Sequence, residues 1–398
     1  MAESGGGFPC QTHRDQAHPN HAVARGFVID QFHMSVVATQ NGSRPASTRA
    51  RRASLSSALL CLLLTSVSCR GGCSRAPVNR GALDGTLAWF PAETQIVVSV
   101  DFRRLRRTTL GQKLPPLATA QPEDRERLDE FTRRTGLDPF QQIDSLIVAF
   151  PEEARETGRI GVVIRGSGLD ESRLVAYARE QVAKSGDDLF SFRHAGRLLW
   201  ASRKAPGTAA FFINDRTLVI GAGGWAQKMA ERTAEPSSPP PSGPETRGAE
   251  TNSELVNLLA RAGAERPLVV AAIVPASTRA NLAADPKLSV AASVSRMAIS
   301  LDGEGQTDLK LTADLATREQ AAAMVDRVGA AILAAKASPT VLLTGMGPFL
   351  ETIHARSDGV ACEIAVQLSA GQTEDLVERL KAFLTLSRQG GIPGFPHP

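Results

Sequence analysis

The chain has 398 residues, of which 42% are hydrophobic and 5% aromatic, with 45 Lys and Arg against 41 Asp and Glu. Residues 1–69 hold six of the basic and three of the acidic side chains, so the remainder carries 39 basic and 38 acidic groups and is close to neutral. This balance argues against a nucleic-acid-binding protein, and the 329 residues after position 69 suffice for two ordinary domains.

The first 33 residues show neither hydrophobic periodicity nor helix caps. Met34 lies just after them, and a signal segment counted from Met34 has ordinary dimensions. We therefore predict that residues 1–33 are a misassigned or disordered extension. Its cysteine and histidines are accordingly not interpreted as a metal site, namely Cys10, His13, His18 and His21.

Residues 34–69 have the pattern of a signal peptide. Arginines at 49, 51 and 52 precede an apolar run at 55–64, which is shorter than the about 20 residues that span a bilayer. Small residues lead to Cys69, and the run resembles a bacterial lipobox, although Ser66 stands where leucine is usual. We predict a lipid anchor such as palmitate on Cys69; simple secretion and a retained membrane anchor are the alternatives.

The predicted elements of the first domain begin with a β-branched strand at 95–101 and a basic helix at 103–112, which Pro115 and Pro116 are expected to end. The carboxylates that follow Pro122 indicate the start of another helix. The further elements are a helix at 122–134, strands at 144–150 and 159–165, a helix from 171, hairpins at 189–202 and 209–220, and a helix at 225–232.

The second domain repeats this order of elements. Its predicted elements are a helix at 253–262, a strand at 267–274, a helix at 277–284, paired strands at 294–301 and 307–314, a helix at 317–335, paired strands at 350–355 and 360–368, and a helix at 373–386. The repeated order predicts an α+β fold with an internal repeat: two related units, each an antiparallel sheet with helices packed on one face.

A proline- and serine-rich run at 235–245 separates the two units, because it lacks apolar residues and backbone donors. The predicted organisation is an extension at 1–33, a signal peptide at 34–69, a tether at 70–83, a first domain at 84–234, a linker at 235–250, a second domain at 251–388 and a tail at 389–398.

This layout resembles uncharacterised exported lipoproteins of Gram-negative bacteria with a duplicated α+β body. The residues that carry the resemblance are the runs at 89–94 (WFPAET) and 212–219 (FINDRTLV), besides the segment ending at Cys69. The resemblance implies a location in the cell envelope, lipid-anchored to a membrane and facing the periplasm or the exterior. It implies no activity, and no functional residue is carried over from it.

Several motifs suggest chemistry that their context does not support. The glycines at 221–224 satisfy a loose dinucleotide fingerprint, but the helix after them runs into the linker instead of leading to a parallel strand. Cys362 is interpreted as a small core residue on a strand, although pairing with Cys73 stays open. We predict no catalytic, metal or cofactor site, and the only site residue predicted is Cys69.

Two functions are compatible with these observations. The favoured one is a non-enzymatic, membrane-tethered binding or scaffold protein whose partner is a lipid, a peptide or a protein. The alternative is an envelope hydrolase with a site between the two halves, for which His354 near Glu351 is the candidate acid–base group. Four arginines are interpreted as a solvated helix face, with contact to anionic head groups as the alternative: Arg103, Arg104, Arg106 and Arg107.

Overall fold

The computed structural model describes residues 83, 85–118, 122–152, 154–234, 248–285, 289–303 and 305–388. The predicted extension, the signal segment with Cys69, the tether up to residue 82, most of the linker and the tail lie outside these residues.

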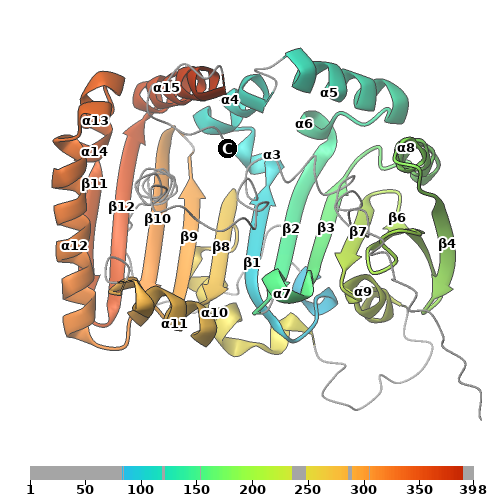
Figure 1. Ribbon diagram of the computed structural model, residues 1–398, viewed down its shortest axis with the longest axis horizontal. Helices are drawn as coiled ribbons and strands as arrows, with labels where there is room; N and C mark the ends of the chain where they lie inside the picture. Colours follow the sequence, from blue (N-terminus) through green and yellow to red (C-terminus); the bar gives the residue numbers. More distant parts are fainter. Residues whose placement is uncertain are drawn as a thin grey trace, which may run out of the picture.

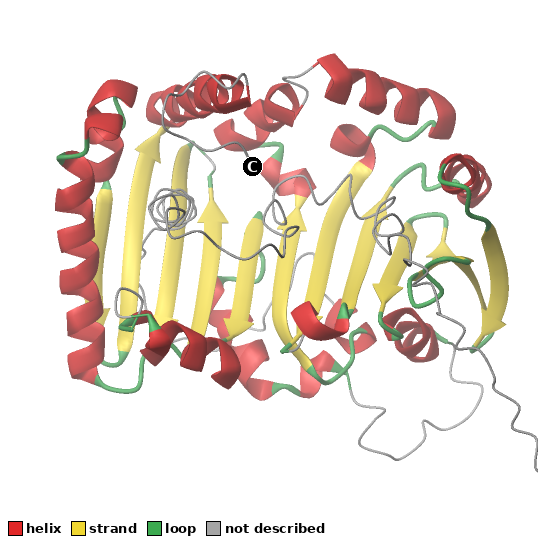
Figure 2. Ribbon diagram, viewed as in Figure 1, coloured by secondary structure: helices red, strands yellow, loops and turns green. Residues whose placement is uncertain are grey.

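All the strands of the described chain belong to one 12-stranded sheet, and every pairing in it is antiparallel (Figures 1 and 2). The predicted α+β fold is thereby confirmed. The two predicted units do not each form a sheet of their own, because β1 (Thr94–Asp101) pairs with both β2 (Ile143–Pro151) and β8 (Leu268–Ile273). The pairing of β1 with β8 joins the halves into one body.

The first half of the sheet continues from β2 through two hairpins. At the tip of the β4–β5 hairpin, Ala195 and Gly196 have φ of 48° and 75°, as a tight two-residue turn requires. The strands beyond β2 are, in spatial order, β3 (Ile160–Gly166), β7 (Thr217–Ala222), β6 (Ala209–Asn214), β5 (Arg197–Ser202) and β4 (Leu189–His194).

The second half continues from β8 in the other direction. The strand predicted at 350–355 begins only at residue 353, because residues 347–351 form helix α14 (Gly347–Glu351), in which Leu350 is buried. The strands beyond β8 are, in spatial order, β9 (Arg296–Asp302), β10 (Gln306–Asp314), β12 (Ala361–Ser369) and β11 (Ile353–Asp358).

Helix α4 (Thr109–Ala118) differs from the prediction, because it continues through the two prolines that were expected to stop the helix. Leu110 and Leu114 of α4 pack against the apolar core, and α4 lies against α15 (Ala370–Arg388). Tertiary packing thus outweighs the missing backbone N–H groups. The other helices discussed below are α3 (Phe102–Leu105), α8 (Glu171–Lys184), α9 (Trp225–Thr233), α10 (Ser253–Ala262) and α12 (Arg318–Lys336).

One face of the sheet, here called the α9 face, carries Val97, Ile147 and Val219 and packs against α9 and α10. Trp225 and Met229 of α9 are fully buried against it. The close approach requires glycine on β3, since a Cβ on Gly161 would lie 2.9 Å from both Met229 Sδ and Trp225 Cε3. This face holds the main apolar core of the first half.

The opposite face, here called the α12 face, is covered in the second half. Met324 and Val328 of α12 pack over Ile364 of β12, and α4, α14 and α15 supply further apolar side chains over Leu309 and Val366. The described helices therefore lie on both faces of the sheet. The core on the α9 face extends into α10, β8 and β9 of the second half, whereas strands β10, β12 and β11 bury their apolar side chains on the α12 face.

Candidate functional site

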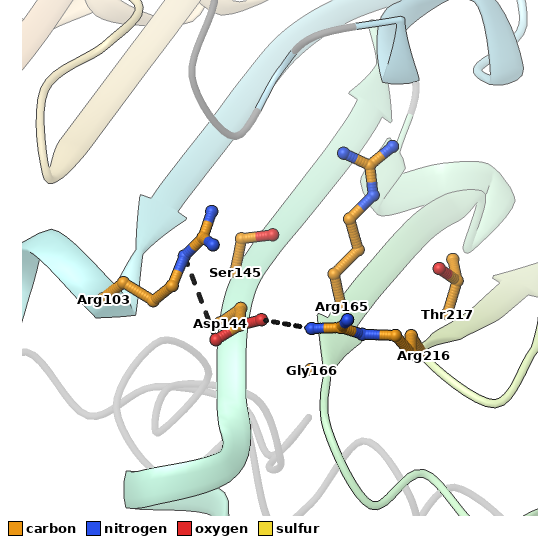
Figure 3. A pocket seen from close by; sticks show the side chains of 7 residues that line it. All are labelled: Arg103, Asp144, Ser145, Arg165, Gly166, Arg216 and Thr217. Atoms are coloured by element: carbon orange, nitrogen blue, oxygen red, sulfur yellow. Dashed lines mark ion pairs between the residues drawn. The ribbon is translucent and has the colours of Figure 1, made fainter.

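A pocket of about 220 Å³ lies where β1 ends in α3, β2 begins, β3 ends and β7 begins. Three of its residues are arginines, and we call it the arginine pocket (Figure 3). It is lined by Arg103, Asp144, Ser145, Arg165, Gly166, Arg216 and Thr217.

Asp144 is the acidic centre of the arginine pocket. Arg103 Nε lies 3.9 Å and Arg216 Nη2 lies 3.7 Å from its carboxylate oxygens, and Arg106 Nη2 lies 3.9 Å away. Tight charge-assisted hydrogen bonds measure about 2.7–2.9 Å. The guanidinium groups therefore surround Asp144 without forming close bonds to it.

Local features of the strands bring these residues together. The register of β2 against β3 shifts between Ile143 and Ser145, and such a bulge re-aims side chains, so the consecutive Asp144 and Ser145 both line the pocket. Gly166 permits the close approach of the neighbouring chain, because a Cβ there would lie 2.3 Å from the Gln142 carbonyl oxygen. The guanidinium carbon of Arg165 lies 5.1 Å from the centre of the Trp89 ring, a cation–π contact.

The arginine on α3 is positioned by the end of β1. Asp101 caps α3 by accepting a hydrogen bond from the backbone N–H of Arg104 at 3.1 Å, and this fixes the turn from which Arg103 extends. The chemistry available in the pocket is the binding of an oxyanion, because its lining residues include three arginines, a serine and a threonine against a single aspartate.

A second feature is an apolar surface on the α12 face in the middle of the sheet. Val98 of β1 lies opposite Val148 of β2 and Val270 of β8, and all three are half-buried. Residues that pair across β3, β2, β1, β8 and β9 form two adjoining rows on this face. We call the surface formed by their half-buried members the central aliphatic face: Ile96, Val98, Phe150, Val148, Val162, Val270, Met297 and Ile299.

No helix among the described residues crosses the middle of β8, β1 and β2 in the view of Figures 1 and 2. The clusters of buried residues on this face lie to either side: one on β3 and β7, and the others under α4, α12, α14 and α15. The central aliphatic face thus offers apolar side chains that the described helices leave half-buried.

The candidate acid–base group of the alternative function is not assembled. His354 is exposed on β11, and Glu351 forms an ion pair of 3.5 Å with Lys336. In the described part of the chain no bond joins His354 to Glu351. His194 Nε2 lies 2.8 Å from Glu231 Oε1, where the pair connects the β4–β5 hairpin to α9 near the surface.

Of the four arginines within 103–107, Arg103, Arg104 and Arg107 are exposed and Arg106 is half-buried. Arg103 lines the arginine pocket, whereas Arg104 pairs with Asp101 and donates to the Glu265 carbonyl oxygen. Arg106 donates to the carbonyl oxygens of residues 140 and 143 at 3.0 and 2.9 Å. Two of the four arginines thus fix the junction between α3 and the sheet.

The glycine motif and the cysteine have structural roles. A Cβ on Gly221 would lie 2.3 Å from the backbone nitrogen of Ala226, and Gly224 caps α9 with φ of 84°. The glycines therefore serve the turn from β7 to α9, and β7 pairs only with antiparallel neighbours. Cys362 is a free, fully buried thiol on β12, and burial followed by the neighbouring Glu363 charge raises its pKa to about 11.

Within the described ranges, no group of histidine, cysteine and carboxylate side chains has the arrangement of a metal site. None of the described helices combines the length and the apolar character needed to cross a membrane. Cys69 and Cys73 lie outside the described residues.

Sequence reasoning missed most of the arginine pocket. Arg103 and Arg216 are more than a hundred residues apart, and neither Asp144 nor Arg165 stands in a recognisable motif. Asp144 was assigned to a strand without a role. The one available signal was the charged residue at the start of an otherwise apolar strand, which is where a bulge re-aims a side chain.

Comparison with known proteins yields little. No family model matches the sequence, and no curated protein matches it. Two crystal forms of the protein TP0453 are similar in structure: form III with a TM-score of 0.39 and 11% identity, and form I with 0.37 and 13%. Each alignment covers 74% of this chain, and 97% or 96% of the TP0453 chain. Similarity at this level is too low to transfer a function.

Proposed function

We propose that this chain is a non-enzymatic binding protein of the cell envelope, tethered to a membrane by lipid on Cys69, and that the central aliphatic face binds the acyl chains of a lipid. The observation that carries the proposal is the central aliphatic face itself, whose side chains are apolar and half-buried. Such a surface offers no side-chain hydrogen bond, so its partner has to be apolar where it touches the protein.

The predicted tether supports a lipid over other apolar partners. Residues 70–82 span at most about 45 Å when extended, so an anchor on Cys69 keeps the body close to the bilayer. Acyl chains are the apolar groups that a bilayer supplies. Burial of a methylene group contributes about 0.8 kcal/mol, so several methylenes against this face suffice for measurable binding.

The proposed lipid anchor on Cys69 is tested by palmitate labelling of the chain expressed in a Gram-negative host. We expect the full chain to incorporate palmitate, and Cys69→Ala to lose the label. Cys73→Ala serves as the matched control, because Cys73 is the next cysteine after the predicted anchor, and it should label like the parent chain. Label retained in Cys69→Ala would refute the anchor while leaving the acyl-binding part of the proposal open to its own test.

Acyl binding is tested by titrating a dansyl-labelled fatty acid into the full chain and following its fluorescence. We expect saturable binding that Val148→Asp weakens at least tenfold, because the new carboxylate must stay hydrated. Val360→Asp is the control, since Val360 is 43% exposed in the turn between β11 and β12. If Val148→Asp and Val360→Asp bound the fatty acid equally well, and both unfolded at the same temperature as the parent chain, the proposal would be wrong.

A further inference from the structure

We propose that the arginine pocket binds a phosphate group. The site is distinct from the surface of the proposed function, because Ser145 and Arg165 lie opposite each other on the α9 face, whereas the central aliphatic face lies on the other side of the sheet. The proposal stands on the charge, the donors and the geometry of the pocket.

The charge of the lining favours an anion. Arg103, Arg165 and Arg216 contribute three positive charges against the single negative charge of Asp144. Arg106, whose Nη2 lies 3.9 Å from Asp144, adds another positive charge beside the pocket. The lining thus keeps an excess of two positive charges, which an anion with two negative charges would balance.

The arginines on either side of Asp144 retain the capacity to bind a ligand. The side chains of Arg103 and Arg216 are 63% and 65% exposed, and their closest approaches to Asp144 are 3.9 and 3.7 Å. Figure 3 shows both guanidinium groups directed toward Asp144 from opposite sides of the pocket. A ligand beside Asp144 can therefore reach these planar donors without first breaking a tight ion pair.

The number and directions of the donors favour a phosphate group over a carboxylate. One guanidinium fork satisfies a planar carboxylate. Here Arg103 and Arg216 supply two guanidinium groups, Ser145 and Thr217 add hydroxyl groups to the same lining, and a tetrahedral group presents oxygens in several directions. The volume of about 220 Å³ is several times the roughly 30 Å³ that a water molecule occupies in the liquid.

A phosphate group can come from free phosphate or from the head group of a lipid, and two probes separate these sources. The full chain is titrated by calorimetry with inorganic phosphate and with a short-chain phosphatidic acid below its micelle concentration. Arg103→Gln and Arg216→Gln test the pocket. Arg203→Gln is the control, because Arg203 is 67% exposed and pairs with Asp188 at 3.0 Å, away from the pocket lining.

We expect each pocket variant to weaken phosphate binding about tenfold, and Arg203→Gln to bind like the parent chain. Asp144→Asn should strengthen binding several-fold, because it removes the competing charge. Arginine-dependent binding of both probes, or of the lipid probe alone, supports the pocket and identifies the source. No binding of either probe, or weakening as large in Arg203→Gln as in the pocket variants, would overturn the proposal.

Lipid binding that depends on Val148 but not on Arg103 or Arg216 would also overturn it, while leaving the proposed function intact. Phosphate binding that depends on the arginines, in a chain that does not bind the fatty acid, would leave the phosphate proposal standing and remove the acyl-binding part of the proposed function.

Discussion

The two halves of the sheet use its two faces in opposite ways. In the first half, the α9 face is apolar and covered, with Ile147 and Phe211 fully buried beneath helices. In the outer strands of the second half, β10, β12 and β11, the same face carries polar side chains such as Lys310 and Glu363, and the apolar residues lie on the α12 face. A continuous sheet has therefore exchanged its buried side between β8 and β10.

This exchange leaves the middle of the sheet as a transition zone. Strands β1, β2 and β8 have apolar residues on both faces, but α9 and α10 cover only one of those faces. The side chains on the other face, among them Val98 and Val148, stay half-buried. The difference between the halves thus produces the central aliphatic face.

The largest expected effect comes from two neighbouring residues on β2 that point to opposite faces. We expect Ile147→Ala to reduce the free energy of unfolding by about 2–5 kcal/mol, because Ile147 is fully buried in the core. Val148→Ala should reduce it by less than about 1 kcal/mol, because Val148 is half-buried. Urea unfolding measures both, and equal losses would contradict the assignment of the covered face.

A smaller effect is expected on the polar α9 face of the second half. Glu363 accepts hydrogen bonds from Lys310 and from Arg356 Nη2, the latter at 2.6 Å. Burial by itself raises the pKa of Glu363, but the two cations outweigh it and hold the pKa below its usual value. Glu363 therefore stabilises the fold above the pKa of the unfolded chain, and this stabilisation is lost as the pH falls through the lowered pKa.

We expect Glu363→Gln to reduce the free energy of unfolding by about 1–2 kcal/mol at neutral pH, with the difference from the parent chain shrinking on acidification. Unfolding curves recorded from neutral pH to about pH 3 check this. The control is Glu254→Gln, because Glu254 is 58% exposed and lies 3.7 Å from Arg296. A constant difference across the pH range would show that the ionised form of Glu363 does not stabilise this face.

Individual helices and hairpins could be predicted from the sequence, because the caps, turns and periodicity that indicate them lie within or next to each element. The helix at 253–262 was predicted with the observed bounds, and Thr317 caps α12 as its sequence indicated, with its side chain accepting from Gln320 N–H. The hairpins followed from their turns. The pairing of β1 with β8 was not predictable, because the two strands are far apart in sequence and both are apolar runs without a distinguishing pattern.

The candidate sites were less accessible to sequence reasoning. Val98, Val148 and Val270 were recognised as strand residues, but which face of their strands the described helices leave half-buried depends on the placement of α9, α10 and α12. The arginine pocket depends on the bulge in β2 and on the pairing of β3 with β7 in the sheet. Both features are products of long-range pairing.

The most direct test of the central claim compares two thiols on the α12 face of one molecule: native Cys362 under α12 and a cysteine introduced by Val148→Cys. Maleimide labelling of the full chain is followed peptide by peptide with mass spectrometry, with and without a long-chain fatty acid. Cys362 should label only on unfolding, because it is fully buried and its pKa is raised to about 11. The Val148→Cys thiol should label rapidly in the folded chain and be protected by the fatty acid. Labelling at position 148 as slow as at Cys362, or unchanged by the fatty acid, would contradict an open, acyl-binding central face.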